Sequence, residues 1–296
     1  MNRFCSRPLF CLIALFISTV SGVDRAAAQP TASRVDITTD VVYGHKHGLA
    51  MTFDVFQPQS ANGAGVLFMV SGGWYSNWSP PEQLLGLLRP LTDAGFTVFA
   101  VRHGSSPKFG IPEAVSDVRR AVRVIRMRAD EFGIEPERLG VFGMSAGGHL
   151  SLMLGTTGDD GNPDVPDAVD RVGNRVQAVV AWVAPTDLTI LIHSSPESLP
   201  AHKNFPALDL DPRAAADHSP LTHVTADDAP ALLLAGDADD LVPIAHSRRI
   251  RDEFQRVGVT HELIEFPGAG HGIGGEQLAQ GTRAMVDWFR DHLLED

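Results

Sequence analysis

Cysteine is nearly absent from this chain. Cys5 and Cys11 are the only two among 296 residues, and both stand within the first 28. A product that begins after residue 28 therefore has no thiol with which to form a disulfide, bind a metal ion or act as a nucleophile. Cys11 stands inside an apolar run, without the small residues that precede a lipidated cysteine, so no lipid anchor is predicted.

Positive charge is also scarce. The formal net charge is -12, and removal of the first 28 residues, which carry three arginines and one aspartate, takes it to -14. Because such a surface repels polyanions, no nucleic acid or anionic lipid partner is expected. The one basic run, RRAVRVIRMR (119–128), spaces its arginines at helical intervals between Val and Ile, which predicts a solvated helix face.

The longest apolar run is too short to cross a bilayer. It extends from Leu9 to Val20, follows Arg3 and Arg7, and precedes the small residues 26–28. A spanning helix needs about 20 apolar residues. The layout is typical of a secretory signal peptide over residues 1–28, cleaved after Ala28. We therefore expect a secreted or periplasmic product without stable membrane insertion.

No repeat, low-complexity tract or long linker divides the rest, so residues 29–296 are predicted to form one domain. Its opening stretches, RVDITTDVVYG and LAMTFDVFQP, alternate polar and apolar residues and predict an antiparallel hairpin at a sheet edge. His45 and His47 lie in the predicted turn, where the lack of a third ligand favours a polar turn over a metal site. The acidic segment 158–167 lacks the spacing of a calcium loop and is predicted to be solvated.

Short, continuously apolar runs then alternate with amphipathic stretches. The runs are GVLFMV (65–70), FTVFAV (96–101), RLGVFG (138–143), AVVAWV (178–183), ALLLAG (231–236) and HELIEF (261–266). Strands that are apolar throughout belong in a mostly parallel sheet covered by helices on both faces, which is the doubly wound α/β class. Binding sites in such sheets lie beyond the carboxyl ends of the strands. The less regular stretch 186–224 is predicted to be a short cap insertion over that edge.

The run VFGMSAGGHL contains the pattern G-x-S-x-G between a predicted strand and a predicted helix. In this context Ser145 is predicted to be a nucleophile held on a sharp turn, with Gly143 and Gly147 permitting close approach of strand and helix. The helix start behind it favours negative charge developing on a bound acyl group. No phosphate-loop pattern is present, which argues against the alternative of a phosphate turn.

A serine nucleophile needs a base and an acid from later loops. His271, between two glycines after the run 261–266, is the predicted base. Three aspartates follow the run 231–236, namely Asp237, Asp239 and Asp240, and the residues alone do not choose among them. His149, one helical turn after Ser145, is interpreted as a packing or hydrogen-bonding residue.

The motifs GxSAGGHL, GDxDxxVP and GAGHG together resemble the esterase branch of the α/β-hydrolase superfamily. They are most similar to the bacterial family grouped with feruloyl and acetylxylan esterases and related to hormone-sensitive-lipase-like enzymes. The resemblance spans nearly the whole mature chain. It implies that the acid is the aspartate three residues before the valine of the Val-Pro pair, which is Asp239. Asp237 and Asp240 are then turn-forming or capping residues.

The oxyanion hole is predicted from the loop Ser71-Gly72-Gly73-Trp74, where related esterases carry a histidine before the glycines. Gly72, Gly73 and Ala146 are the predicted amide donors, and a simple tight turn is the alternative interpretation of the glycine pair. Ser71 departs from the family histidine, which usually braces the loop, and this departure bears on which amides form the hole. Aromatic residues follow closely, and they are interpreted either as an acyl or aryl binding wall or as core packing: Trp74, Tyr75, Trp78 and Phe109.

The resulting prediction is a secreted serine carboxylesterase without a cofactor or a metal. Its substrate would be a small-molecule or polysaccharide ester, with acetyl or feruloyl groups implied by the resemblance. Two alternatives are a prolyl-oligopeptidase-like peptidase and a catalytically silent binding protein on a hydrolase scaffold. The sequence does not indicate an oligomeric state.

Overall fold

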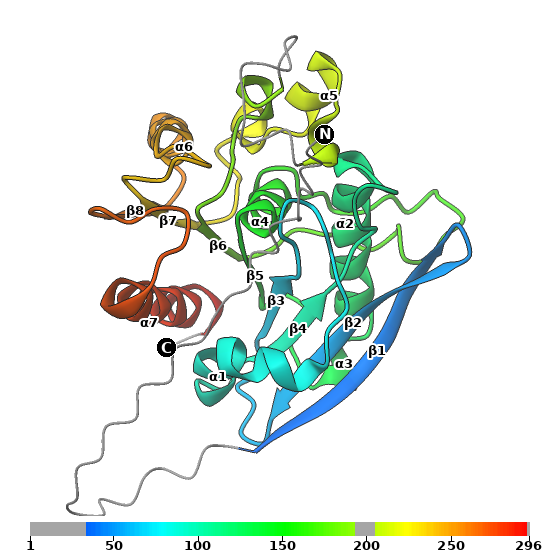
Figure 1. Ribbon diagram of the computed structural model, residues 1–296. Coiled ribbons are helices and arrows are strands. Elements are labelled where there is room, and N and C mark those ends of the chain that lie inside the picture. Colours follow the sequence, from blue (N-terminus) through cyan, green and yellow to red (C-terminus); the bar gives the residue numbers. More distant parts are fainter. Residues whose placement is uncertain (1–33, 193–204, 295–296) are drawn as a thin grey trace, which may run out of the picture. The chain divides into compact units, whose positions relative to one another are not determined.

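The computed structural model describes residues 34–192 and 205–294. Residues Ser33–Asp296 group into one compact unit (Figure 1). The predicted signal peptide, residues 1–28, lies outside the described residues, and its cleavage and the domain start at residue 29 stay predictions.

An eight-stranded sheet forms the centre of the unit, in the order β1-β2-β4-β3-β5-β6-β7-β8. β1 and β2 pair antiparallel with each other, β2 pairs antiparallel with β4, and the remaining pairs are parallel. The predicted doubly wound, mostly parallel sheet is therefore confirmed. The strands are β1 (Val35–Lys46), β2 (Leu49–Pro58), β3 (Gly65–Met69), β4 (Thr97–Val101), β5 (Leu139–Met144), β6 (Ala178–Trp182), β7 (Ala231–Gly236) and β8 (His261–Phe266).

The burial of the strands explains why their residues are apolar throughout. All residues of β3, β4, β6 and β7 are buried, since helices cover both faces of the sheet. The hairpin at the edge turns at His47 and Gly48, both with positive φ, as the predicted polar turn requires. Among the described residues, no group of three or more His, Cys, Asp or Glu could hold a metal ion.

Two apolar cores lie on the two faces of the sheet. Side chains of α2, α4 and α6 join one core, and side chains of α1 and α7 join the other. None of the described helices is long and apolar enough to cross a membrane. The helices are α1 (Leu85–Asp93), α2 (Ile111–Met127), α3 (Ala129–Phe132), α4 (Ala146–Thr156), α5 (Pro212–Asp217), α6 (Ala245–Val257) and α7 (Gly275–Leu293), with 3-10 turns at Pro81–Leu84, Leu188–Ile190, Pro206–Leu208 and Pro220–His223.

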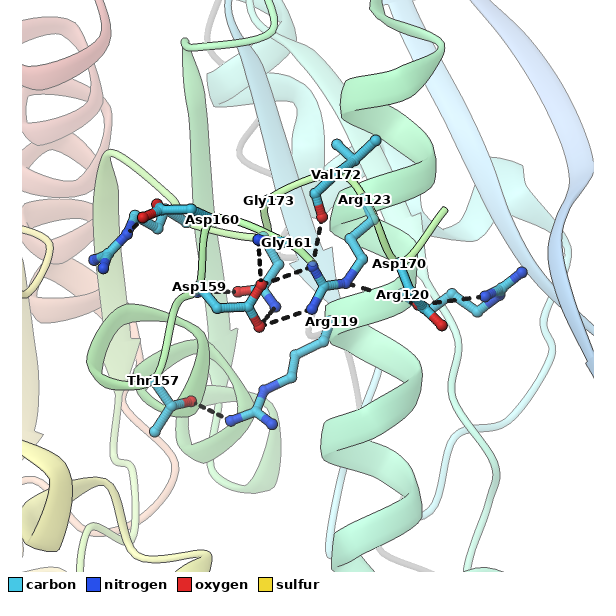
Figure 2. A network of polar contacts seen from close by, with 12 residues as sticks. Arg119, Arg120, Arg123, Thr157, Asp159, Asp160, Gly161, Asp170, Val172 and Gly173 are labelled. Carbon is cyan, nitrogen blue, oxygen red and sulfur yellow. Dashed lines mark hydrogen bonds and ion pairs between the residues drawn. The ribbon is translucent and has the colours of Figure 1, made fainter. Parts of the chain in front are cut away.

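Arg120 and Arg128 of the run 119–128 keep 33% and 31% of their side-chain surface exposed. The prediction of a solvated face was wrong for Arg123 and Arg126. The acidic loop after α4 folds over them (Figure 2). The Arg123 guanidinium donates two hydrogen bonds to Asp159, at 2.8 and 2.7 Å, and a third to the Val172 carbonyl. Arg126 donates to the carbonyls of Gly173 and Arg175. The Arg123 and Arg126 side chains keep only 11% and 9% of their surface exposed, because the loop supplies the acceptors that water would otherwise provide.

The insertion between β6 and β7 lies at the carboxyl edge of the sheet. Its described parts include α5 and the 3-10 turns on either side of it, while residues 193–204 fall outside the described residues. The Thr186 backbone N–H donates to His246 of α6, and the Leu188 N–H donates to Ser219, so the start of the insertion is tied to α6 and to a later part of the insertion.

Candidate active site

Ser145 occupies a strained backbone position between β5 and α4. Its φ of 54° and ψ of -119° are rare for a residue with a side chain. The flanking glycines make the turn possible, because a Cβ on Gly143 would lie 2.4 Å from the Gly147 backbone, and one on Gly147 would lie 2.7 Å from the Met69 carbonyl oxygen. The predicted reason for these two glycines is confirmed.

Asp239 and His271 form a hydrogen bond between the loops that follow β7 and β8. His271 Nδ1 lies 2.8 Å from Asp239 Oδ2. The second carboxylate oxygen accepts the backbone N–H groups of Leu241 and Val242, at 2.9 and 2.8 Å. The carboxylate side chain is 1% exposed and the imidazole 26% exposed. One end of the pair is therefore fixed in the protein and the other faces solvent.

The hydrogen bonds favour the charged form of Asp239. Burial alone would raise the pKa of Asp239, but the hydrogen bonds from His271, Val242 and Leu241 together hold that pKa below its ordinary value. Since a carboxylate only accepts, His271 Nδ1 carries the hydrogen and Nε2 carries a lone pair. This tautomer can accept a proton at Nε2.

Ser145 and the Asp239 loop border one pocket. Ser145 and Val242 both line it, and the Ser145 N–H donates to the Trp182 carbonyl at the end of β6, the strand between β5 and β7. Within the part of the chain that the structure describes, neither Ser145 Oγ nor His271 Nε2 has a hydrogen-bond partner. Contacts of this kind often tighten only when substrate binds.

The other two aspartates of this loop behave as turn residues. Asp237 accepts the Gly268 N–H at 2.6 Å and so joins the loop after β7 to the loop after β8. Asp240 is exposed. Only Asp239 contacts His271 among the three.

The loop predicted as an oxyanion hole is a tight turn with two positive φ angles. Gly73 and Trp74 have φ of 57° and 60°, and Gly72 and Tyr75 exchange two backbone hydrogen bonds of 3.0 Å across the turn. The Gly72 N–H is therefore already donated to Tyr75, and the prediction that it serves as a donor does not hold in this conformation. The Gly73 N–H, at the tip of the turn, and the Ala146 N–H, at the start of α4, keep the predicted role as candidates.

Trp74 is held by a buried chain of hydrogen bonds. Its indole N–H donates to His149 Nδ1 at 3.3 Å, and His149 Nε2 donates to the His218 carbonyl at 2.7 Å. The rings of Trp74 and His149 meet edge to face with centroids 5.4 Å apart. His149 is thus a packing and hydrogen-bonding residue, as predicted, and it joins the turn to α4 and to the residue that ends α5.

The predicted aromatic wall is divided between two places. Trp74 lines the pocket at Ser145, together with Phe205 and Leu208 of the insertion; the pocket has a volume of about 20 Å³. Trp78 and Phe109 line a separate cavity of about 620 Å³. Tyr75 is half-buried within the turn and closes it through its backbone.

His103 is a residue of the site that no sequence motif indicated. It lies two residues after the end of β4. Its Nε2 lies 2.9 Å from the Oγ of Ser71, the residue immediately before the glycine turn. Its position at the carboxyl end of an apolar strand was the available signal, because polar residues there face the binding edge of the sheet.

One family model and several curated proteins match this chain. The family model BD-FAE matches residues 53–254. The probable carboxylic ester hydrolase LipM of Mycobacterium tuberculosis is 29% identical over 262 residues, which cover 84% of this chain and 60% of LipM. The acetylxylan esterase of Xylanibacter ruminicola is 26% identical, over 81% of this chain and 46% of that protein. The chain thus spans about 60% of the length of the first of these curated relatives and less of the second.

Solved structures resemble the whole unit. A truncated carbohydrate esterase from gut microbiota has a TM-score of 0.74 and 26% identity, over 90% of this chain and 99% of that one. An acetyl ester-xyloside bifunctional hydrolase from Caldicellulosiruptor lactoaceticus has a TM-score of 0.73 at 22% identity, over 89% and 98% of the two chains, which supports the fold. Because the family match covers more than half of the chain, this protein belongs to the BD-FAE family, and it has the α/β-hydrolase fold.

Proposed function

We propose that this protein is a serine carboxylic ester hydrolase that uses Ser145 as nucleophile, His271 as base and Asp239 as the acid that orients the base. The observation that carries the proposal is the hydrogen bond between Asp239 Oδ2 and His271 Nδ1, which leaves Nε2 as an acceptor at the same sheet edge as Ser145. Relatives named as carboxylic ester hydrolases and esterases support the reaction class.

The reaction divides into two steps. Ser145 Oγ attacks the ester carbonyl carbon while His271 Nε2 takes its proton, and the carbonyl oxygen becomes an oxyanion held by the Gly73 and Ala146 amides. The C–O bond to the alcohol then breaks, and His271 returns the proton to the leaving alcohol. Water attacks the acyl-enzyme by the same route, which releases the acid and restores the serine.

The size of the Ser145 pocket favours a short acyl group. A volume of about 20 Å³ holds little more than one water-sized group, so an acetyl methyl fits, while a feruloyl group needs Phe205 or Leu208 to move. We therefore favour acetyl over feruloyl esters.

The larger cavity, lined by Ser76, Trp78 and His103 next to the glycine turn, is a candidate site for a sugar residue of the substrate away from the ester itself. The exposed Trp78 indole, 61% exposed, offers a flat surface for a sugar ring, and Ser105 and Lys108 offer hydrogen-bond donors beside it. The names of the acetylxylan esterase and carbohydrate esterase relatives support a saccharide ester as substrate.

Export of the protein is part of the proposal. The pattern of residues 1–28 supports it. Expression of the full chain in a bacterial host, followed by fractionation and N-terminal sequencing, should give a periplasmic or secreted product beginning at Gln29. A full-length product in the cytoplasm would contradict export without affecting the proposed chemistry.

Hydrolysis of p-nitrophenyl acetate tests the activity. The wild type should turn over this ester, and Ser145→Ala should not, while Ser60→Ala, an exposed serine far along the chain, should match the wild type. Hydrolysis of peptide anilides at a comparable rate would favour the peptidase alternative. Absence of turnover with every ester and anilide would favour a silent binding protein.

A further inference from the structure

His103 and Ser71 form a buried contact of defined polarity beside the glycine turn. His103 Nδ1 lies 2.9 Å from the Gly104 carbonyl oxygen, which only accepts, so Nδ1 carries the ring hydrogen. Nε2 then accepts the hydroxyl hydrogen of Ser71 at 2.9 Å. His103 is 3% exposed, and burial lowers its pKa, which favours the neutral ring that this arrangement needs.

Further hydrogen bonds tie both sides of the turn to the segment that carries His103. The His103 N–H donates to Ser76 Oγ at 3.2 Å, and the Ser76 hydroxyl donates to the Val70 carbonyl at 2.6 Å. The Ser106 N–H donates to the Trp74 carbonyl at 3.0 Å. The turn is therefore held at its start, at its tip and after its end by one neighbouring loop.

That loop is itself anchored by charged groups away from the turn. Arg102 makes a buried pair with both oxygens of Asp54, at 2.6 and 2.8 Å. Asp117 of α2 accepts the Gly104 N–H at 2.8 Å and pairs with Lys46 at 2.6 Å. The imidazole of His103 is thus a rigid support for the start of the glycine turn.

We propose that His103 is a positioning residue for the oxyanion turn, acting through the Ser71 hydroxyl to fix the direction of the Gly73 N–H. The inference rests on the proposed function. Trp74 holds a positive φ angle, which a residue with a side chain adopts only under constraint, and loss of the Ser71 contact removes a constraint at the start of the turn. The donor would then lie off the place where negative charge develops, which slows the chemical step more than it weakens substrate binding.

Two variants remove the contact from opposite sides. His103→Leu and Ser71→Ala should each lower kcat for p-nitrophenyl acetate by about 10- to 100-fold and change KM by less than about threefold. The double variant should lose no more than the worse single variant, because both act through one hydrogen bond. His103→Gln, whose amide oxygen can accept from Ser71, should restore kcat to within about fivefold of the wild type.

A ligand that mimics the tetrahedral state separates positioning from general damage. Phenylboronic acid forms a bond between boron and Ser145 Oγ and places a negative oxygen in the oxyanion hole, so its Kd should rise with the fall in kcat. Tyr43→Phe is the matched control. It removes a buried hydrogen bond of 2.5 Å to the Arg102 carbonyl, one residue from His103, without touching the turn, and should keep both kcat and Kd.

The outcomes distinguish this inference from the proposed function. Wild-type activity that survives Ser145→Ala would overturn the proposed function. Activity that depends on Ser145 but is unchanged by Ser71→Ala in a folded protein would overturn the role of His103 alone. A rise in KM with kcat unchanged in His103→Leu and Ser71→Ala would also overturn it, and so would an equal fall in kcat in Tyr43→Phe.

Discussion

The buried imidazole of His149 should make the stability of the fold depend on pH. His149 is fully buried, accepts from Trp74 at Nδ1 and donates to the His218 carbonyl at Nε2, so only the neutral ring satisfies both partners. Burial lowers the pKa of His149 to about 4 from its ordinary 6.5, although the bond to the His218 carbonyl acts in the opposite direction.

The size of the effect follows from this difference. Between pH 6.5 and pH 4 the unfolded chain protonates this histidine and the folded chain does not, so stability is present above pH 6.5 and is lost as pH falls toward 4. At about 1.4 kcal/mol per pKa unit, His149 should remove about 2 kcal/mol of unfolding free energy between pH 7 and pH 5, and about 3 kcal/mol by pH 4.

Urea denaturation at pH 7, 6 and 5 measures this loss. His149→Gln should be less stable than the wild type at pH 7 and should lose about 2 kcal/mol less between pH 7 and pH 5. His45→Gln replaces an exposed histidine in the same way and should follow the wild-type curve. Parallel pH curves for the wild type and His149→Gln would refute the reasoning, since the imidazole would then gain protons equally in both states.

The remaining predictions concern the site and its support. Asp239→Asn should lower kcat for p-nitrophenyl acetate by about 10⁴-fold, because His271 would lose the tautomer that accepts a proton at Nε2. Asp237→Asn should lower kcat by less than about tenfold, and equal losses in steady-state assays would contradict the role of Asp239. Trp78→Ala should raise KM for acetylated xylo-oligosaccharides at least about fivefold and leave p-nitrophenyl acetate unchanged, and an equal change for both would exclude a saccharide site there. Arg123→Leu should lower the unfolding free energy by about 2 kcal/mol, and Arg128→Leu, which breaks an exposed pair with Glu131, by less than about 1 kcal/mol; thermal melts that rank them the other way would contradict the burial argument.

Much of the fold follows from local patterns in the sequence. The predicted runs 231–236 and 261–266 coincide with β7 and β8. β7 is buried along its whole length and leaves an unbroken apolar run, whereas β8 lies at the edge of the sheet, is mostly half-buried and keeps charged residues. The contact between Asp239 and His271 was also predictable, since adjacent parallel strands end at one edge.

The predictions that failed depend on contacts between segments far apart in the sequence. No sequence pattern predicts that Trp74 adopts a positive φ. The hydrogen bond from the Gly72 N–H to the Tyr75 carbonyl depends on the turn that this φ creates, so it could not be predicted either. The arginines of α2 meet their acceptors in a loop some 40 residues later, so helical spacing alone could not show that Arg123 is covered. The separation of Trp78 from Ser145 likewise depends on how the loop turns in space.

Covalent labelling of Ser145 tests the central claim most directly. A fluorophosphonate reacts with a serine only where a base removes its proton, and peptide mass spectrometry locates the adduct. We expect one phosphonyl group on Ser145 in the wild type, and we expect labelling of His271→Ala to be at least about 100-fold slower. An adduct on another residue, or equal labelling of Ser145 with and without the His271 imidazole, would contradict it.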